Sequence, residues 1–201
     1  MLKEIQGFGD MAEVSHGTSV TSGESVGIEG YYHVECRDKD GNFKWEESFP
    51  NLVNAIGKQL LLDTLLRTSG TYTTVGPFLG LINSSPTFLA ADTMTSHAGW
   101  TEFIAYTVSA SPVRGTAVFA ASTSSGLSPA NITSSLATAI TYTITGAGGT
   151  VAGCFLVTGA GAVSTQSSTA GTLYSAGAFA TAKITTVGDT VSVTYSTTAT
   201  S

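Results

Sequence analysis

The chain has 201 residues, of which 42% are hydrophobic and only 11% are charged, and its formal net charge is −6. This length is enough to bury a sizeable core, and the acidic balance argues against binding a phosphate backbone, which requires clustered Lys and Arg. No apolar run approaches the roughly 18 residues that span a bilayer, and the start, MLKEIQGFGDMAE, lacks the features of a secretory signal. We therefore expect no nucleic-acid partner and no membrane partner.

The charged residues are concentrated in the N-terminal third. The first 67 residues carry 17 of them, and the remaining 134 carry five. These five are Asp92, Glu102, Arg114, Lys183 and Asp189. Because charge keeps protein surfaces apart in solution, so long a segment with so little charge indicates surface that partners cover.

The N-terminal segment predicts an extended arm. It has no clean hydrophobic period and ends in the Ser/Thr/Gly-rich run HGTSVTSGESVG. Segments of this kind gain order by contact with another surface. We assign residues 1–29 to the arm, 30–70 to a β-hairpin and a helix that packs on the body, and 71–201 to the body.

The run GYYHVECRDKDGNFKWEESF predicts a β-hairpin with strands Tyr31–Arg37 and Asn42–Phe49. Between them, Asp40 and Gly41 form the D-G pair that supplies the positive φ angles of a tight turn. Five aromatic residues lie on this hairpin: Tyr31, Tyr32, Phe43, Trp45 and Phe49. They are candidates for a carbohydrate or partner patch, but alternate residues must face inward, so at least half of them are expected in the core.

The run PNLVNAIGKQLLLDTLLRTSG predicts one helix that covers a sheet face. Asn51 is the expected cap, Arg67 suits the C-terminal dipole, and Gly70 follows the end. The residues with helical spacing are Leu52, Val53, Ile56, Leu60, Leu61, Leu65 and Leu66.

Seven short runs rich in β-branched or aromatic residues follow, separated by Gly, Ser and Pro. The runs are GPFLGLIN, WTEFIAYTV, GTAVFAAS, ATAITYTIT, GTVAGCFLVT, GTLYSAGAFATAKIT and DTVSVTYSTTA. With no second helix between them, they predict a mainly β fold, an antiparallel β-sandwich of jelly-roll or immunoglobulin-like type. In the last run, Val191, Val193 and Tyr195 are expected on one face. Cys36 and Cys154 have no metal-ligand spacing and are expected to pack as reduced thiols.

The stretch ADTMTSHAGWTEF collects residues that resemble a site. A metal site would take Asp92, His97 and Glu102 as ligands, but their spacing of five and five fits neither one helix face nor one strand face. We favour a structural corner in which Asp92 caps a turn, Gly99 makes a tight bend and Trp100 fills the core. The predicted structural motif is therefore Asp92, His97, Gly99, Trp100 and Glu102.

Other patterns typical of catalysis are weak. The glycines of TGAGGTVAG (145–153) lie between two strand-like runs, so we predict a hairpin turn rather than a phosphate-binding loop. A hydrolase of cell-wall or capsular sugars requires a carboxylate pair, for which the β-rich part offers only Asp92, Glu102 and Asp189. We expect no catalytic residues, no metal and no cofactor.

Four stretches resemble a family of tailed-bacteriophage proteins. They are WEESFPNLVNAIGKQLLLDTLL, FLGLINSSPTFLAADTMTSHAGWTEF, and the pair TVAGCFLVTG and GTLYSAGAFATAKITTVGDTVSVTYS. The resemblance covers the chain from about Tyr32 to the end, and HAGWTE is its most specific part. The family is that of capsid cement, or decoration, proteins encoded among head-assembly genes.

The resemblance implies a β-sandwich or jelly-roll body and no catalytic residues. It implies a non-enzymatic virion protein on the capsid exterior, assembled in the host cytoplasm, which stabilises the shell by bridging major capsid protein subunits. We expect self-association as a homodimer or homotrimer. The alternative is a tail, neck or receptor-binding component of the same kind of particle.

Overall fold

The structure is a computed structural model that describes residues 27–66, 75–83, 86–124 and 132–200. Within these ranges it contains thirteen strands and one helix, α1. The predicted arm, residues 1–29, lies outside the described residues except for its last three, which belong to the first strand.

The first sheet is antiparallel and has the order β2–β1–β13–β10–β6. β9 also pairs with β13, and β8 pairs with β9. Its strands are β1 (Gly27–Arg37), β2 (Phe43–Pro50), β6 (Tyr106–Thr107), β8 (Thr123–Ser124), β9 (Ile132–Ser135), β10 (Ile140–Ile144) and β13 (Thr190–Thr200). β1 pairs with β13 over the whole length of both strands, from Gly27 opposite Thr200 to Arg37 opposite Thr190.

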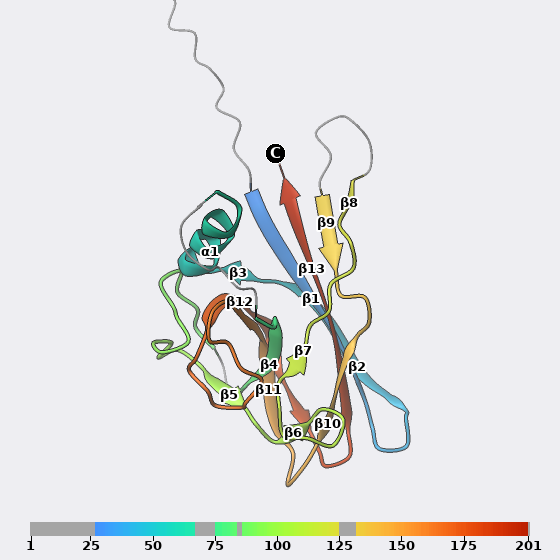
Figure 1. Cartoon of the computed structure of the whole chain (residues 1–201). Helices are drawn as coiled ribbons and strands as arrows, with labels where there is room; N and C mark the ends of the chain where they lie inside the picture. The colour runs from blue at the N-terminus through green and yellow to red at the C-terminus, as the bar shows by residue number, and fades with distance from the viewer. Residues whose placement is uncertain (1–26, 67–74, 84–85, 125–131, 201) are drawn as a thin grey trace, which may run out of the picture.

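The second sheet is also antiparallel and has the order β3–β12–β11–β4–β5, with β7 pairing with β4. Its strands are β3 (Leu52–Val53), β4 (Phe78–Asn83), β5 (Thr101–Phe103), β7 (Gly115–Thr116), β11 (Gly149–Thr158) and β12 (Thr172–Thr185). The two sheets pack face to face, and buried residues of both form one core cluster (Figure 1). This confirms the predicted mainly β antiparallel sandwich.

Each of the seven predicted segments contains a strand. Val191, Val193 and Tyr195 are all buried on the core face of β13, as the alternation predicts. The run WTEFIAYTV is divided into β5 and β6, which belong to different sheets. The sequence did not predict β9, which is short and rich in serine.

The predicted hairpin is confirmed, since β1 and β2 pair from Tyr31 opposite Pro50 onward. Its loop differs in detail, because Gly41 has the positive φ angle (84°) and Asp40 does not. Asp38 orders the loop, and its Oδ1 accepts the backbone N–H of Asp40 at 2.9 Å and of Asn42 at 2.8 Å. Of the hairpin aromatics, Tyr32 and Phe49 are buried and Trp45 packs against the core, while Tyr31 and Phe43 are exposed.

The helix α1 spans Ala55–Leu66, so the start predicted at Asn51 is wrong. Leu52 and Val53 form β3 instead, because they pair with Ala176 and Ser175 and complete the backbone hydrogen bonding along part of β12. Asn54 occupies the cap position, and its carbonyl oxygen accepts the Lys58 N–H at 3.0 Å. The predicted C-terminal signals at 67 and 70 lie outside the described residues.

The contact between α1 and β12 depends on a glycine. A Cβ atom on Gly57 would lie 2.6 Å from the Tyr174 carbonyl oxygen, so only glycine lets the helix approach the strand this closely. The helix lies at one end of the sandwich, where β1 begins and β13 ends (Figure 1). It therefore covers part of one strand rather than a whole sheet face.

The glycine-rich run 145–153 forms a turn but not the predicted hairpin. The strands on its two sides, β10 and β11, belong to different sheets and do not pair. Gly146 and Gly148 have φ angles of 61° and 73°, which lets the chain cross from one sheet to the other in four residues.

Cys36 and Cys154 are free thiols buried in the core, as predicted. Burial, together with the nearby Asp189 charge, raises the pKa of Cys36 to about 11. Burial raises the pKa of Cys154 well above its usual value. Both thiols therefore stay protonated at neutral pH and pack as small apolar groups.

Candidate functional site

Asp92 is buried and stabilises a tight turn in the loop between β4 and β5. Its Oδ2 accepts the Leu89 N–H at 2.9 Å, and its own N–H donates to the Leu89 carbonyl at 3.0 Å. The same carbonyl accepts Nδ2 of Asn54 at 3.1 Å. The Asp92 carboxylate therefore holds the turn that ties this loop to the start of α1.

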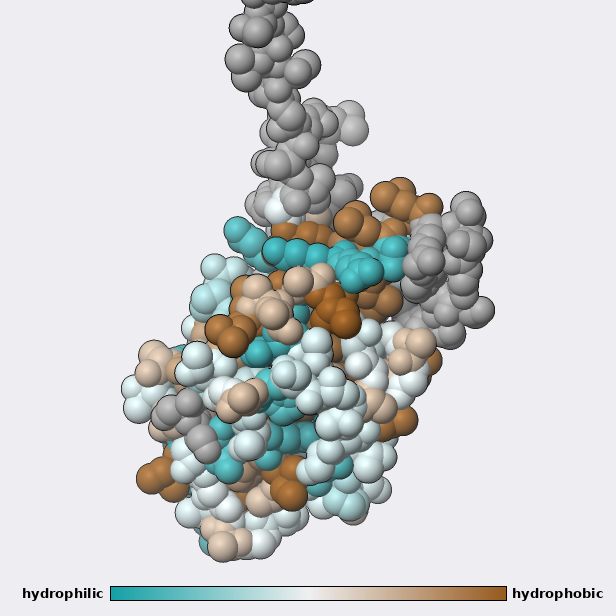
Figure 2. Space-filling model, turned by 90° about the vertical axis from the view of Figure 1, so that its left-hand side faces the viewer, coloured by the Kyte–Doolittle hydropathy of each residue, from teal (hydrophilic) through white to brown (hydrophobic). Residues whose placement is uncertain are grey.

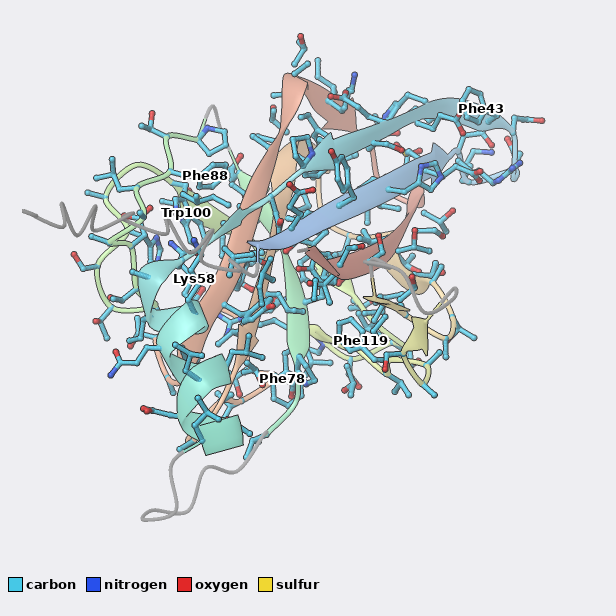
Figure 3. All side chains as sticks on the ribbon, turned by 90° about the horizontal axis from the view of Figure 1, so that it is seen from above. Phe43, Lys58, Phe78, Phe88, Trp100 and Phe119 are labelled. Atoms are coloured by element: carbon cyan, nitrogen blue, oxygen red, sulfur yellow. The ribbon has the colours of Figure 1, made fainter. Side chains whose placement is uncertain are left out.

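His97 and Trp100 form a stacked pair in the same loop, with ring centroids 3.9 Å apart. His97 Nδ1 lies 3.1 Å from the Trp100 carbonyl oxygen, to which it donates in the tautomer that carries the proton there. Trp100 is buried and contacts Phe88 and Phe155, with centroid distances of 6.3 and 5.1 Å. The histidine thus covers a core tryptophan, which lies beside Phe88 in Figure 3.

Gly99 allows two chain segments to lie in direct contact. The Thr87 N–H donates to the Gly99 carbonyl at 3.0 Å, and a Cβ atom on Gly99 would lie 2.1 Å from the Thr87 carbonyl oxygen. Its φ angle is not positive. The glycine is therefore required for close approach rather than for the tight bend that the sequence suggests.

Glu102, on β5, forms a buried ion pair with Arg114. Arg114 donates from Nε to Oε1 at 2.9 Å and from Nη2 to Oε2 at 2.7 Å, and the two side chains are 1% (Arg114) and 8% (Glu102) exposed. The guanidinium carbon also lies 5.1 Å from the ring centroid of Phe155. Two parallel hydrogen bonds between buried groups give this contact a specific geometry as well as strength.

The same ion pair holds a distant loop in place. Oε2 of Glu102 accepts the Ser167 N–H at 2.8 Å, and Arg114 Nη2 donates to the Ser168 carbonyl at 2.8 Å. Ser167 has a φ angle of 60°, a strained conformation that these bonds stabilise. A hollow of about 240 Å³ lies beside the pair, lined also by His97 and Trp100.

The geometry of these groups fits a structural role better than a chemical one. Burial, followed by the Glu102 charge, raises the pKa of Tyr106 well above its usual value, so its hydroxyl stays protonated and donates to Glu102. Asp189 is engaged elsewhere, by Lys44 and Thr186. The described residues contain no group of three side chains arranged to hold a metal ion.

Sequence reasoning identified Glu102 but missed its partner. Arg114 lies twelve residues later, after a loop, so no local pattern joins the two. The sequence does contain one signal, the small number of charged residues, because these are two of only five charged residues beyond position 67. In a body with so few charges, a buried carboxylate needs a cation or hydrogen-bond donors close by, and Arg114 is one of only two cations in that part of the sequence.

The second candidate region is the exposed face of α1. This helix is apolar on most sides, yet Leu62 and Leu66 are 56% and 75% exposed, and Ile56 is partly exposed. Leu89, also exposed, lies in the turn that is bonded to the helix start. Figure 2 shows the side of the molecule on which α1 lies, with brown, apolar residues above and below a teal, polar strip near the top. We call Ile56, Leu62, Leu66 and Leu89 the α1 face.

An apolar hollow of about 290 Å³ opens on the inner side of the same helix. Leu60 and Leu61 of α1 form one wall, and Leu156, Tyr174 and Tyr195 extend it between the two sheets. Phe119 closes the opposite side (Figure 3). The hollow is thus the open end of the sandwich core, and we call it the α1 hollow.

No protein family, no curated protein and no solved structure matches this chain. Within the described ranges, no helix has the length and apolar character needed to cross a membrane.

Proposed function

We propose that this protein is a non-enzymatic structural component of a tailed-bacteriophage virion. In this proposal it binds the outer surface of the capsid and bridges major capsid protein subunits. The observation that carries the binding role is the α1 face, where Leu62 and Leu66 lie one helical turn apart and are 56% and 75% exposed. Large apolar side chains that are exposed next to one another mark interaction sites.

The sequence resemblance to cement proteins supplies the setting. The body's low charge and its abundance of small residues suit a surface that packs closely against a lattice and against other copies of the chain. A homodimer or homotrimer presents two or three α1 faces at once, so that weak contacts act together.

The stabilising mechanism is mass action. A protein that binds only the intact lattice, across a boundary between subunits, disfavours every state in which those subunits separate. No bond needs to be made or broken for this function. The site therefore has to provide complementary surface rather than reacting groups.

The carboxylates of the β-rich body favour this role over that of a sugar hydrolase. Asp92 binds a backbone amide, Glu102 binds Arg114, and Asp189 binds Lys44. A glycosidase keeps its pair of carboxyl groups facing one another across a substrate cleft. Here each carboxylate is committed to a separate contact within the fold.

Copy number per particle tests the proposal. Quantitative mass spectrometry of purified virions gives the ratio of this protein to the major shell protein. We expect one copy, or a simple fraction of a copy, per shell subunit. A handful of copies per particle would instead assign the protein to the tail or neck, and absence from the particle would overturn the structural role.

A further inference from the structure

The α1 hollow is a part of the core that the described residues leave partly exposed. Leu156 and Tyr195 come from facing sheets and are buried, whereas Leu60, Leu61 and Tyr174 at the same hollow are only partly covered. Apolar surface at the open end of a core is unfavourable in water, and the free energy falls when apolar side chains cover it. The hollow has room for a few side chains rather than for a folded partner.

The chain enters the described structure close to this hollow. β1 begins at Gly27, opposite Thr200, and Gly30 pairs with Thr197, which lines the hollow. Three residues of β-strand span about 10 Å. The start of β1 and the end of β13 lie at the same end of the sandwich as α1 (Figure 1). Residues 1–26 therefore join β1 at a point about 10 Å along the strand from the wall of the hollow.

The sequence of residues 1–26 has two parts. The first part contains four large apolar residues, namely Leu2, Ile5, Phe8 and Met11. Residues 15–26, SHGTSVTSGESV, are mostly Ser, Thr and Gly, a composition typical of linkers. Gly- and Ser-rich linkers of twelve residues have a root-mean-square span of about 20 Å, which exceeds the distance of about 10 Å between Gly27 and the wall of the hollow.

We infer that residues 1–11 place their apolar side chains in the α1 hollow of the same chain. A short tether holds them at an effective concentration in the millimolar range, which favours the chain's own residues over those of another copy at ordinary protein concentrations. The seated residues complete the open end of the core and lie next to the α1 face. This inference does not depend on the proposed function, because it concerns an isolated chain.

Cysteine cross-linking of the full chain tests this inference. Phe8→Cys is combined with Thr64→Cys, which places a thiol on an exposed residue at the hollow. Under mild oxidation we expect rapid formation of a disulfide within one chain, detected by mass spectrometry and by mobility on a non-reducing gel. The native Cys36 and Cys154 are buried, so the parent protein serves as the blank.

The matched control moves the second thiol to the far hairpin. Phe8→Cys with Asp40→Cys pairs the same tethered thiol with an exposed position at the tip of the β1–β2 loop. We expect the hollow pair to cross-link at least about tenfold faster, because tethering to the site raises the local concentration. Equal rates for the two pairs, or cross-links between chains instead of within one, would overturn the inference.

A further variant separates apolar seating from random collision of the tether. Adding Leu2→Asp and Ile5→Asp to the hollow pair leaves tether length and both thiols unchanged. We expect the cross-linking rate to fall to that of the hairpin control, because charged side chains do not enter an apolar hollow. An unchanged rate would show that the apolar residues do not seat there.

Discussion

The Glu102–Arg114 cluster and the α1 end of the molecule use opposite kinds of side chain. In the cluster, charged groups are buried and their hydrogen bonds are made within the fold, from Arg114 to Glu102 and from Ser167 to Glu102. At the α1 end, apolar groups face outward on the α1 face and into a hollow that is only partly filled. The region whose residue types suggest a catalytic site has its hydrogen bonds made within the fold. The region without such residue types leaves apolar side chains exposed.

The difference shows where binding energy is available. A buried ion pair whose hydrogen bonds are complete holds loops in place and has little capacity left for a ligand. When a partner covers exposed leucine side chains, the burial of their apolar surface favours binding. Residue types that suggest a catalytic site therefore need to be judged by what their atoms already bind.

Breaking the ion pair is the strongest test of this comparison. Arg114→Met leaves Glu102 buried without its cation, and we expect the free energy of unfolding to fall by about 3–5 kcal/mol. Urea denaturation with circular dichroism measures the change. The matched control, Arg114→Met with Glu102→Leu, removes both charges and should recover most of the loss. A single variant within about 1 kcal/mol of the parent would show that the pair does not hold the loops.

Gly99→Ala tests the close approach in the same region. The added Cβ atom would meet the Thr87 carbonyl oxygen at 2.1 Å, so the backbone must shift. We expect a loss of about 1–3 kcal/mol, measured by the same denaturation. Ala98→Ser, at the exposed neighbouring position, should stay within about 0.5 kcal/mol. Equal effects of the two changes would contradict the close-packing interpretation.

Asp189 provides a pH-dependent test of a second internal ion pair. Burial acts to raise the pKa of Asp189, but hydrogen bonds from Lys44 and Thr186 hold it below its usual value. Because the folded pKa is the lower one, the stability that this group contributes is present above pH ~4 and is lost as pH falls through the folded pKa. Asp189→Asn should therefore cost about 1–2 kcal/mol at neutral pH.

The measurement is the difference in free energy of unfolding between Asp189→Asn and the parent across the acid range. We expect this difference to shrink steadily as pH falls below about 4. A difference that is constant with pH would mean that the Asp189 charge contributes nothing to stability.

The smallest expected change in stability lies on the α1 face. Leu62→Ser with Leu66→Ser alters side chains that are already exposed, so the free energy of unfolding should change by less than about 0.5 kcal/mol. Thermal denaturation provides the measurement. A larger loss would indicate that these side chains contribute to the fold, and the contrast between the Glu102–Arg114 cluster and the α1 end would weaken.

Local patterns were sufficient to predict the sandwich but not its connections. Alternation gives the buried face of β13 through Val191 and Val193, because the β period acts within one strand. The pattern around Leu52 suits a helix as well as a strand, and pairing with β12 decides for the strand. The sequence predicts a hairpin at 145–148, and this is wrong because local residues do not encode which distant strands the two neighbouring strands join.

The candidate sites show the same limit. Asp92 lies in the loop where its sequence context suggests a turn residue, and its partner is three residues away. Glu102 and Arg114 are brought together by a segment that passes through β6 of the other sheet, and the α1 hollow is built from segments far apart in the sequence. For side chains that interact across such distances, the only hint in the sequence is its composition, here the small number of charged residues.

The most direct test of the account is the affinity of three purified forms for capsid shells that lack this protein. The forms are the parent chain, Leu62→Ser with Leu66→Ser, and Glu102→Leu with Arg114→Met, compared by co-sedimentation over a range of concentrations. We expect the α1-face variant to bind at least about tenfold more weakly, because two serines bury much less apolar surface on binding than two leucines do. We expect the ion-pair variant to bind like the parent. An α1-face variant that binds as the parent does would contradict the claim that this face is the binding surface.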